Sequence, residues 1–141
     1  MQISKNFSYD EMYYSATAKR LGIDNTPNEK ELAELVKLVN TILQPIRDKW
    51  GSPIIVTSGF RSEVLNKAVG GVKNSQHRLG QAADIKIGSR SQNKALFNFI
   101  YDMIQKGEIK VGQLIDEYNY SWVHVSLPRE GKTNNQVLHI K

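Results

Sequence analysis

Two histidines and one aspartate have the spacing expected of residues that bind a metal ion together. Asp84 alternates with apolar residues in the segment AADIKI (82–87), and His124 does so in WVHVSL (122–127). Successive side chains of a strand point to opposite faces, so both polar side chains are expected on the face away from the core. His77 lies in a loop seven residues before Asp84. Two imidazoles and one carboxylate, with no fourth protein ligand, are typical of a catalytic zinc site, which keeps one position for water.

The same three residues leave other interpretations open. Two histidines and one carboxylate also form the facial triad of non-haem iron oxygenases. In those sites the first histidine and the carboxylate usually lie close together on one strand, whereas seven positions separate His77 from Asp84. Without a metal, Asp84 would cap a turn and His124 would be an exposed strand residue. The spacing alone does not choose among these interpretations.

Composition excludes several classes of chemistry. The chain has 141 residues and no cysteine, which excludes disulfides, thiolate zinc sites and thiol catalysis. Its formal net charge of +5 favours a polyanionic environment such as nucleic acid, acidic lipid or an anionic cell-wall polymer. Because Lys and Arg are scattered and not clustered with aromatic residues, we expect no nucleic-acid partner. The length predicts a single domain, residues 1–141, and we expect a monomer.

Hydropathy and the N-terminus bear on where the protein acts. No apolar run approaches the roughly 20 residues that a spanning helix needs, so no membrane partner is expected. The opening segment MQISKNFSYDEMYY lacks the apolar centre of a signal peptide. We therefore expect cytoplasmic synthesis without a Sec signal, and another route to any site of action outside the cell.

Helices in the first part of the chain and strands in the last part are expected to position these residues. Apolar periodicity and capping patterns predict three helices: about 9–20, from the N-cap Thr26 to about Trp50, and 91–106. Pro45 is expected to kink or to shorten the second of them. Alternating or β-branched runs predict five strands: PIIVTSGF (53–60), AADIKI, QLIDEY (113–118), WVHVSL and QVLHIK (136–141). The first of these strands is expected to be buried. The pattern predicts an α+β fold with a mostly antiparallel sheet and helices packed on one face.

Five short motifs occur along the chain in a distinctive order. They are SGFRS (58–62), Asn66, VGG (69–71), SQHRLGQAAD (75–84) and WVHVS (122–126). Together they resemble the zinc D-Ala-D-Ala carboxypeptidases, a family of peptidoglycan peptidases with the hedgehog/DD-peptidase fold. The opening helix followed by RLGIDNTP is similar to the branch of that family common in bacteriophages and prophages. The resemblance implies a zinc peptidase that hydrolyses an amide bond in the peptide stem or cross-link of peptidoglycan.

The resemblance also implies roles for individual residues. The implied zinc ligands are His77, Asp84 and His124. Arg61 matches an arginine that serves the substrate or the transition-state oxygen, although a structural ion pair would also explain it. Ser75 matches a serine that contacts the substrate, or it bonds its own loop. Trp122, beside the site, is expected to contact the substrate or to pack in the core.

One position departs from the family pattern and leaves the catalytic base open. Many relatives have a glutamate or aspartate three residues before the last histidine, where this chain has Ser121. If QLIDEY and WVHVSL form a hairpin, Glu117 pairs with Trp122 and lies one diagonal step from His124, on the same face. A three-residue loop would place Asp116 there instead. We therefore favour Glu117 as the base and keep Asp116 as the alternative.

The resemblance implies one of two functions. The first is a zinc metallopeptidase, D-Ala-D-Ala carboxypeptidase-like or L-Ala-D-Glu endopeptidase-like, which acts as a phage endolysin after lysis, as part of a phage particle, or as a bacterial remodelling enzyme. The second is a non-catalytic, zinc-containing module that binds the cell wall or forms part of a phage. Ser121 keeps this second interpretation open. The sequence does not specify which peptide bond is cleaved.

Overall fold

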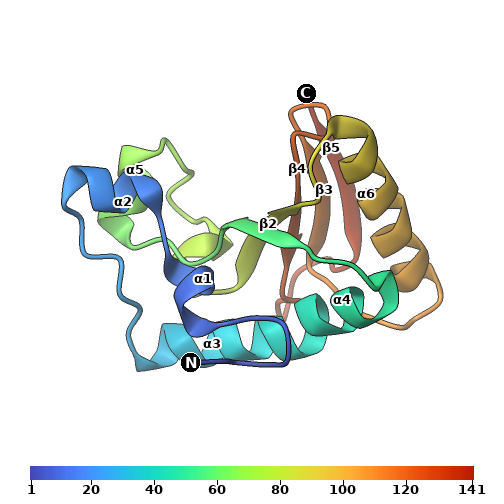
Figure 1. Ribbon diagram of the computed structural model, residues 1–141, viewed down its shortest axis with the longest axis horizontal. Coiled ribbons are helices and arrows are strands. Elements are labelled where there is room, and N and C mark those ends of the chain that lie inside the picture. The colour runs from blue at the N-terminus through green and yellow to red at the C-terminus, as the bar shows by residue number, and fades with distance from the viewer.

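A five-stranded sheet lies at the centre of the computed structural model, which describes all residues 1–141 (Figure 1). Its strands are β1 (Ile55–Ser58), β2 (Ala82–Lys86), β3 (Gln113–Glu117), β4 (Trp122–Ser126) and β5 (Gln136–Ile140). Their order across the sheet is β1-β2-β4-β3-β5, and only the β3–β5 pair is parallel. The predicted α+β fold with a mostly antiparallel sheet is confirmed.

The register of the sheet brings the polar residues of neighbouring strands side by side. Asp84 of β2 pairs directly with His124 of β4. In the β3–β4 hairpin Glu117 pairs with Trp122, which is the predicted register. Ile85, next to Asp84, belongs to the hydrophobic core and is fully buried. The alternation of side chains along the strands therefore separates an apolar face from a face that carries polar residues.

Long helical segments cover the apolar face of the sheet. They are α3 (Glu29–Leu38), the π-helical η1 (Val39–Leu43), α4 (Gln44–Trp50) and α6 (Arg90–Gln105). Their apolar stripes and the inward residues of the strands share one cluster of 23 buried residues. Burial of one large aliphatic side chain contributes about 1.5–3 kcal/mol, so this core holds the strands independently of the polar face.

Four shorter helical segments lie within the first 79 residues of the chain. They are α1 (Tyr9–Tyr13), α2 (Ala16–Leu21), α5 (Glu63–Ala68) and the 3-10 turn η2 (Gln76–Leu79). In Figure 1, α2 and α5 lie together on the side of β1 that is away from β3, β4 and β5. No helix in the structure combines the length and the apolar character required to cross a membrane.

The first helical segment is divided, whereas a single helix over residues 9–20 was predicted. Tyr14 has an extended backbone, and Ser15 then begins α2 by accepting a hydrogen bond from the backbone N–H of Ala18. A second cap-forming serine thus competes with helix continuation, a pattern that apolar periodicity does not detect. Gly22 ends α2 in the left-handed conformation.

The predicted N-cap of the next helix was wrong, because Asn28 and not Thr26 caps α3. The Asn28 side chain accepts a hydrogen bond from the Glu31 backbone N–H, and the Glu31 carboxylate accepts one from the Asn28 N–H, both at 2.8 Å. The N–H of Thr26 is instead bound to the side chain of Asp24 at 3.0 Å. Thr26 and Asn28 are each followed three residues later by a glutamate, and the capping box forms between Asn28 and Glu31.

Pro45 is accommodated by a π-helical turn, so the helical path continues to Trp50. The N–H of Gln44 binds the carbonyl of Val39, five residues earlier, at the end of η1. Pro45 then lies in the first turn of α4. A local π-bulge absorbs the irregularity that a proline imposes within a helix.

The prediction that the first strand is buried was wrong. β1 lies at one edge of the sheet and pairs only with β2, and its residues alternate between exposed and half-buried. A short run of β-branched residues fits an edge strand as well as a central one, and the position of a strand in the sheet depends on contacts that are distant in sequence.

Candidate metal centre

His77 is positioned by a short turn that is fixed against helix α3. At the start of η2 the Ser75 hydroxyl accepts a hydrogen bond from the His77 backbone N–H at 3.1 Å. Gly80 ends the turn with a φ of 74°. A Cβ atom on Gly80 would overlap with the carbonyl oxygen of Glu31 in α3. The close packing of this turn therefore requires glycine, both for its backbone conformation and for space.

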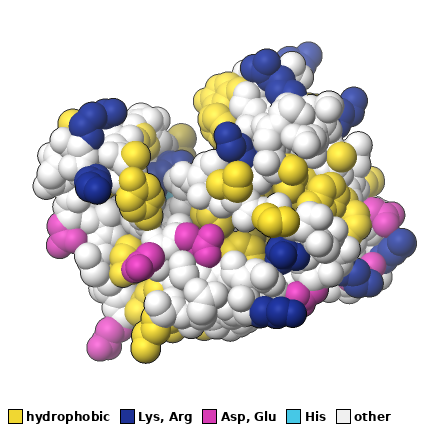
Figure 2. Space-filling view, in the orientation of Figure 1, with side chains coloured by type: hydrophobic (Ala, Val, Ile, Leu, Met, Phe, Trp, Pro, Cys, Tyr) yellow, Lys and Arg dark blue, Asp and Glu magenta, His cyan; other side chains and the backbone are white.

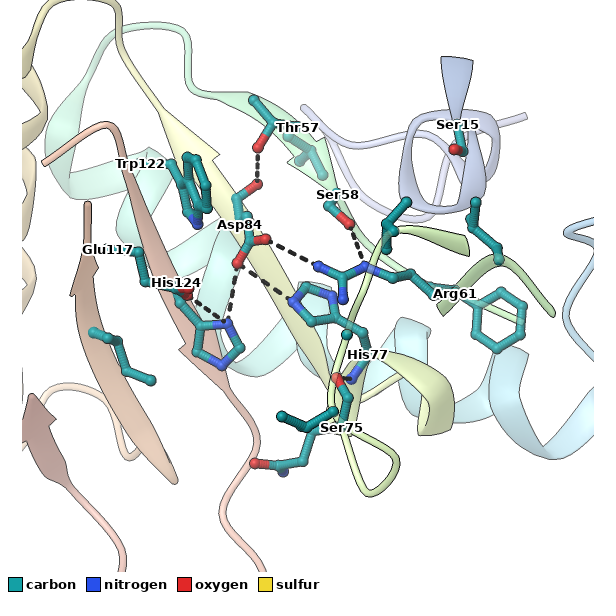
Figure 3. A pocket seen from close by; sticks show the side chains of 18 of the residues that line it. Ser15, Thr57, Ser58, Arg61, Ser75, His77, Asp84, Glu117, Trp122 and His124 are labelled. Carbon is teal, nitrogen blue, oxygen red and sulfur yellow. Dashed lines mark hydrogen bonds and ion pairs between the residues drawn. The ribbon is translucent and has the colours of Figure 1, made fainter. Parts of the chain in front are cut away.

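The side chains of His77, Asp84 and His124 converge on the polar face of the sheet (Figure 3). Asp84 Oδ1 lies 3.3 Å from His77 Nε2 and 3.0 Å from His124 Nδ1. One nitrogen or oxygen atom from each residue lies within 4.8 Å of the others, and all three residues are buried. This cluster of two imidazoles and one carboxylate could therefore hold a metal ion.

A hydrogen bond behind His77 determines which of its ring nitrogens is free. His77 Nδ1 lies 2.7 Å from the carbonyl oxygen of Gly59. A carbonyl only accepts, so Nδ1 donates this bond, and Nε2 is the ring nitrogen that faces Asp84 and the cluster. A histidine whose second nitrogen donates to a backbone carbonyl is typical of metal ligands, because this bond fixes the tautomer and the ring orientation.

Asp84 is a carboxylate under neutral conditions although it is buried. Burial alone would raise the pKa of Asp84, but hydrogen bonds from His124 and His77 outweigh this effect and hold the pKa well below its usual range. One anionic oxygen and two imidazole nitrogens are the donor types of catalytic zinc sites with three protein ligands. The donor set and the fixed tautomer of His77 therefore fit a zinc ion.

Arg61 joins the cluster from the loop that follows β1. Its Nη2 lies 3.5 Å from Asp84 Oδ2, its Nε donates to the Ser58 hydroxyl at 3.1 Å, and its Nη1 donates to Asn66 Oδ1 at 3.2 Å. Its backbone N–H binds the carbonyl of His77 at 3.0 Å. The structural ion pair considered from the sequence is present, and the same side chain lines the cleft above the cluster.

The two carboxylates at the end of β3 lie on opposite faces of the sheet. Glu117 Oε2 is 3.5 Å from His124 Nδ1, and burial together with the nearby Asp84 raises the pKa of Glu117. Asp116 instead accepts hydrogen bonds from the Tyr120 N–H at 2.6 Å and from His139 Nδ1 at 2.9 Å. Of the two candidates for the catalytic base, the structure therefore brings only Glu117 to the cluster.

The cluster lies at the bottom of a cleft of about 880 Å³. Figure 2 shows this hollow between the part of the surface formed by α2 and α5 and the part that contains β3, β4 and β5. Trp122 and Tyr118 line one side with ring centroids 5.1 Å apart, and the buried Nε1 of Trp122 has no hydrogen-bond partner. Ser75 also lines the cleft, although its hydroxyl already caps the turn of His77.

The match to a family model covers most of the chain. The model for Peptidase M15 matches residues 5–126, which include the three residues of the cluster. This chain belongs to the Peptidase M15 family. The resemblance inferred from the sequence motifs is confirmed at the level of the family.

A curated relative matches a shorter part of this M15 chain. The zinc D-Ala-D-Ala carboxypeptidase of Streptomyces albus G is 49% identical to it over 49 residues. The matched segment is 34% of this chain and 19% of the Streptomyces protein, so the similarity spans about a fifth of the relative's length.

Two residues that support the M15 metal centre were not assigned a role in the analysis of the sequence. Gly59 acts through its backbone carbonyl, which orients His77. Every residue type has such a carbonyl, so the sequence does not indicate this role. Asn66 is 3% exposed, and it accepts from Arg61 while donating to the carbonyl of Val72 at 2.8 Å. Both residues belong to the motifs that carry the family resemblance, and this was the only sequence feature that pointed to them.

A methyl group added at Gly71 is expected to disturb the support of Arg61. A Cβ at this position would overlap with Asn66 Oδ1 and lie 3.0 Å from Arg61 Nη1. Because Asn66 is buried and bound on both sides, it has little freedom to move. We expect Gly71→Ala to destabilise the fold by about 1–3 kcal/mol, as overpacking does. Thermal unfolding measures this, with Val72→Ala, 72% exposed in the same loop, as a control. An unchanged melting temperature for Gly71→Ala would contradict the rigidity of this support.

Proposed function

We propose that this M15 chain is a zinc-dependent peptidase that hydrolyses an amide bond in the peptide part of peptidoglycan. The observation that carries the proposal is the position of Glu117, whose carboxylate lies 3.5 Å from His124 beside a cluster of three metal-binding residues. A metal-binding cluster alone would suit a binding module. A carboxylate base within reach of the same cluster is what hydrolysis additionally requires.

Different residues of the chain would bind the metal ion and transfer the proton in such a reaction. His77, Asp84 and His124 would hold the zinc ion, which lowers the pKa of water and polarises the scissile carbonyl when it is bound. Glu117 would accept a proton from the attacking water and return it to the leaving amine nitrogen. Its raised pKa suits both steps, because the group must take up and release a proton.

Arg61 and Trp122 supply donors on the two sides of the cluster. The Arg61 guanidinium would bind the carbonyl oxygen of the scissile bond or a carboxylate of the substrate, since it already lies 3.5 Å from Asp84 and lines the cleft. The buried Trp122 N–H lies near the Glu117 carboxylate, where it favours the ionised form, and would donate to that carboxylate or to the substrate. Ser75 would make a further substrate contact from the turn of His77.

The charges of the cleft suit a peptide that carries carboxylates. Lys86 and Arg129 line it, and neither belongs to the four ion pairs that Lys and Arg side chains form in this chain. Stem peptides of peptidoglycan are rich in carboxylates, and the Streptomyces relative is named for D-Ala-D-Ala. We therefore propose a D-Ala-D-Ala carboxypeptidase-like activity, with L-Ala-D-Glu endopeptidase activity as the alternative. An endolysin-like role in a bacteriophage, after cytoplasmic synthesis, is part of the same proposal and is supported by the phage-like opening segment.

Digestion of purified peptidoglycan, followed by mass spectrometry of the released fragments, tests this function. Release of free D-alanine is expected for a carboxypeptidase, and new N-terminal D-glutamate for an endopeptidase that cuts after L-alanine. Each product should disappear when a chelator is added. If no bond is cleaved but the protein sediments with insoluble peptidoglycan, the non-catalytic binding module replaces the peptidase.

A further inference from the structure

The turn between β3 and β4 links two residues of the cleft and has an unusual backbone. Glu117 precedes the turn and Trp122 follows it. Between them, Tyr118, Asn119 and Tyr120 have φ values of 52°, 56° and 62°. Residues other than glycine rarely adopt this left-handed conformation, so three in succession persist only if surrounding contacts hold them. The position of Glu117 therefore depends on what supports this turn.

Asn93 of α6 supports the turn from the helical side of the sheet. It is 1% exposed, and its Nδ2 donates to the carbonyl oxygens of Tyr120 at 2.9 Å and Ser121 at 3.1 Å. These partners are 27 and 28 positions further along the chain. A buried polar side chain that bridges such distant segments fixes their separation as well as satisfying their hydrogen bonds.

The same amide also binds the end of the strand that carries Asp84. Asn93 Oδ1 accepts from the backbone N–H groups of Ile87 at 2.8 Å and Gly88 at 3.2 Å, just after β2. Backbone N–H groups only donate and carbonyls only accept, so these neighbours determine the orientation of the Asn93 amide. Asn93 thus joins the end of a strand that carries a candidate metal ligand to the turn that carries the candidate base.

Other contacts hold the turn without reaching β2. Asp116 accepts from the Tyr120 N–H at 2.6 Å, the Ser121 hydroxyl donates to the Tyr118 carbonyl at 2.7 Å, and the Tyr118 N–H binds the carbonyl of Ile140 at 2.6 Å. These bonds stabilise the shape of the turn and its contact with β5. Asn93, in contrast, binds both the turn and the end of the strand that carries Asp84.

We propose that Asn93 is a positioning residue, which sets the place of Glu117 relative to the metal-binding cluster by joining the β3–β4 turn to the end of β2. Its catalytic consequence rests on the proposed hydrolysis, whereas its effect on the turn does not. Loss of the amide would leave buried backbone groups without partners on both sides. The left-handed turn would then lose its connection to the end of β2 and keep only its bonds to β3, to β5 and within itself, and Glu117 would move away from the cluster.

Two substitutions test separately the bonds that Asn93 accepts at the end of β2 and those that it donates to the turn. Asn93→Asp keeps an acceptor for the N–H groups of Ile87 and Gly88 but has no donor for the carbonyls of the turn. Asn93→Ala removes both the acceptor and the donor. The matched control is Ser126→Ala, which removes the partly buried hydrogen bond from the Gln113 N–H to Ser126 Oγ, 3.0 Å long, at the opposite end of the same hairpin.

Amide hydrogen exchange of the zinc-loaded protein and steady-state kinetics on a peptidoglycan stem peptide measure the effect. In both Asn93 variants we expect exchange within residues 118–121 to be at least about tenfold faster, because the turn opens locally. We expect kcat to fall by at least about tenfold with a smaller change in KM, because displacing a catalytic group slows the reaction more than it weakens binding. Zinc content should be unchanged, and Ser126→Ala should leave both the exchange in the turn and kcat close to wild type.

The outcomes distinguish this inference from the proposed function. If Asn93→Asp exchanges and turns over like wild type, the positioning role is overturned. If wild type cleaves no peptide, the proposed hydrolysis fails, and exchange alone decides the inference: faster exchange confined to the turn supports it, and unchanged exchange overturns it. If neither Asn93 variant folds while Ser126→Ala does, Asn93 is a residue of general stability and the inference is overturned as well.

Discussion

Replacement of Glu117 by glutamine is expected to lower the rate of peptide hydrolysis by at least about a hundredfold, within the range of about 10²–10⁴ typical of general acid–base groups. Glutamine keeps the size and hydrogen-bonding reach of the side chain but cannot accept the proton of the attacking water. The carboxylate lies 3.5 Å from His124 and is not part of the three-residue cluster, so zinc content should be unchanged. Release of stem-peptide fragments and elemental analysis of the same sample measure the two quantities.

Asp116→Asn is the matched control for this substitution, because it neutralises the adjacent carboxylate on the opposite face of the sheet. Asp116 accepts hydrogen bonds from Tyr120 and His139, so the variant is expected to be less stable while keeping most of its hydrolytic rate when folded. If Asp116→Asn loses its rate with its turn intact, and Glu117→Gln does not, the assignment of the base is wrong.

The strands of the site could be predicted because their pattern is local. In β2 and β4 the alternation of polar and apolar residues determines which side chains share a face, and this alternation needs only neighbouring positions. The register of the β3–β4 hairpin was also predicted, since it depends on the length of one short loop. The cluster of His77, Asp84 and His124 is a direct consequence of these local patterns together with the turn before β2.

The contacts that hold the site could not be predicted, because they join segments that are distant in sequence. Gly59 orients His77 through a backbone carbonyl, and Asn93 reaches a turn 27 positions away. Neither residue type indicates such a role in its local context. The exposed position of β1 has the same cause, because the place of a strand in a sheet depends on which other strands pair with it.

Prediction from local patterns also failed where two patterns indicated different helix boundaries. Thr26 and Asn28 both begin plausible capping patterns, and the choice was made by the reciprocal bonds of Asn28 with Glu31. The division of the first helix at Ser15 is similar, since a capping serine and a helical periodicity overlap there. In both cases the free energies of the alternatives differ by about one hydrogen bond, or about 1 kcal/mol, which a sequence pattern does not resolve.

Removal of the metal by a chelator is expected to abolish hydrolysis while most of the far-ultraviolet circular dichroism is retained. The 23-residue core lies among the helices and on the apolar sides of the strands, and none of the three cluster residues belongs to it. In addition, the cluster remains hydrogen-bonded without a metal, since the Asp84 carboxylate is bound by both histidines and has a lowered pKa. A buried charge that is compensated in this way does not drive unfolding.

The melting temperature should nevertheless fall by several degrees on chelation, because a ligand that binds only the folded state at 100 times its Kd stabilises it by about 2.7 kcal/mol. Readdition of about one equivalent of zinc should restore both the melting temperature and the activity, as expected for a site with three protein ligands. The matched variant is Asp84→Ala, which removes the ligand that bridges the two histidines. It should lose zinc and activity together and should not respond to added metal. Cooperative unfolding of wild type by the chelator at room temperature would contradict this account, since it would mean that the metal, and not the apolar core, holds β2 and β4 in register.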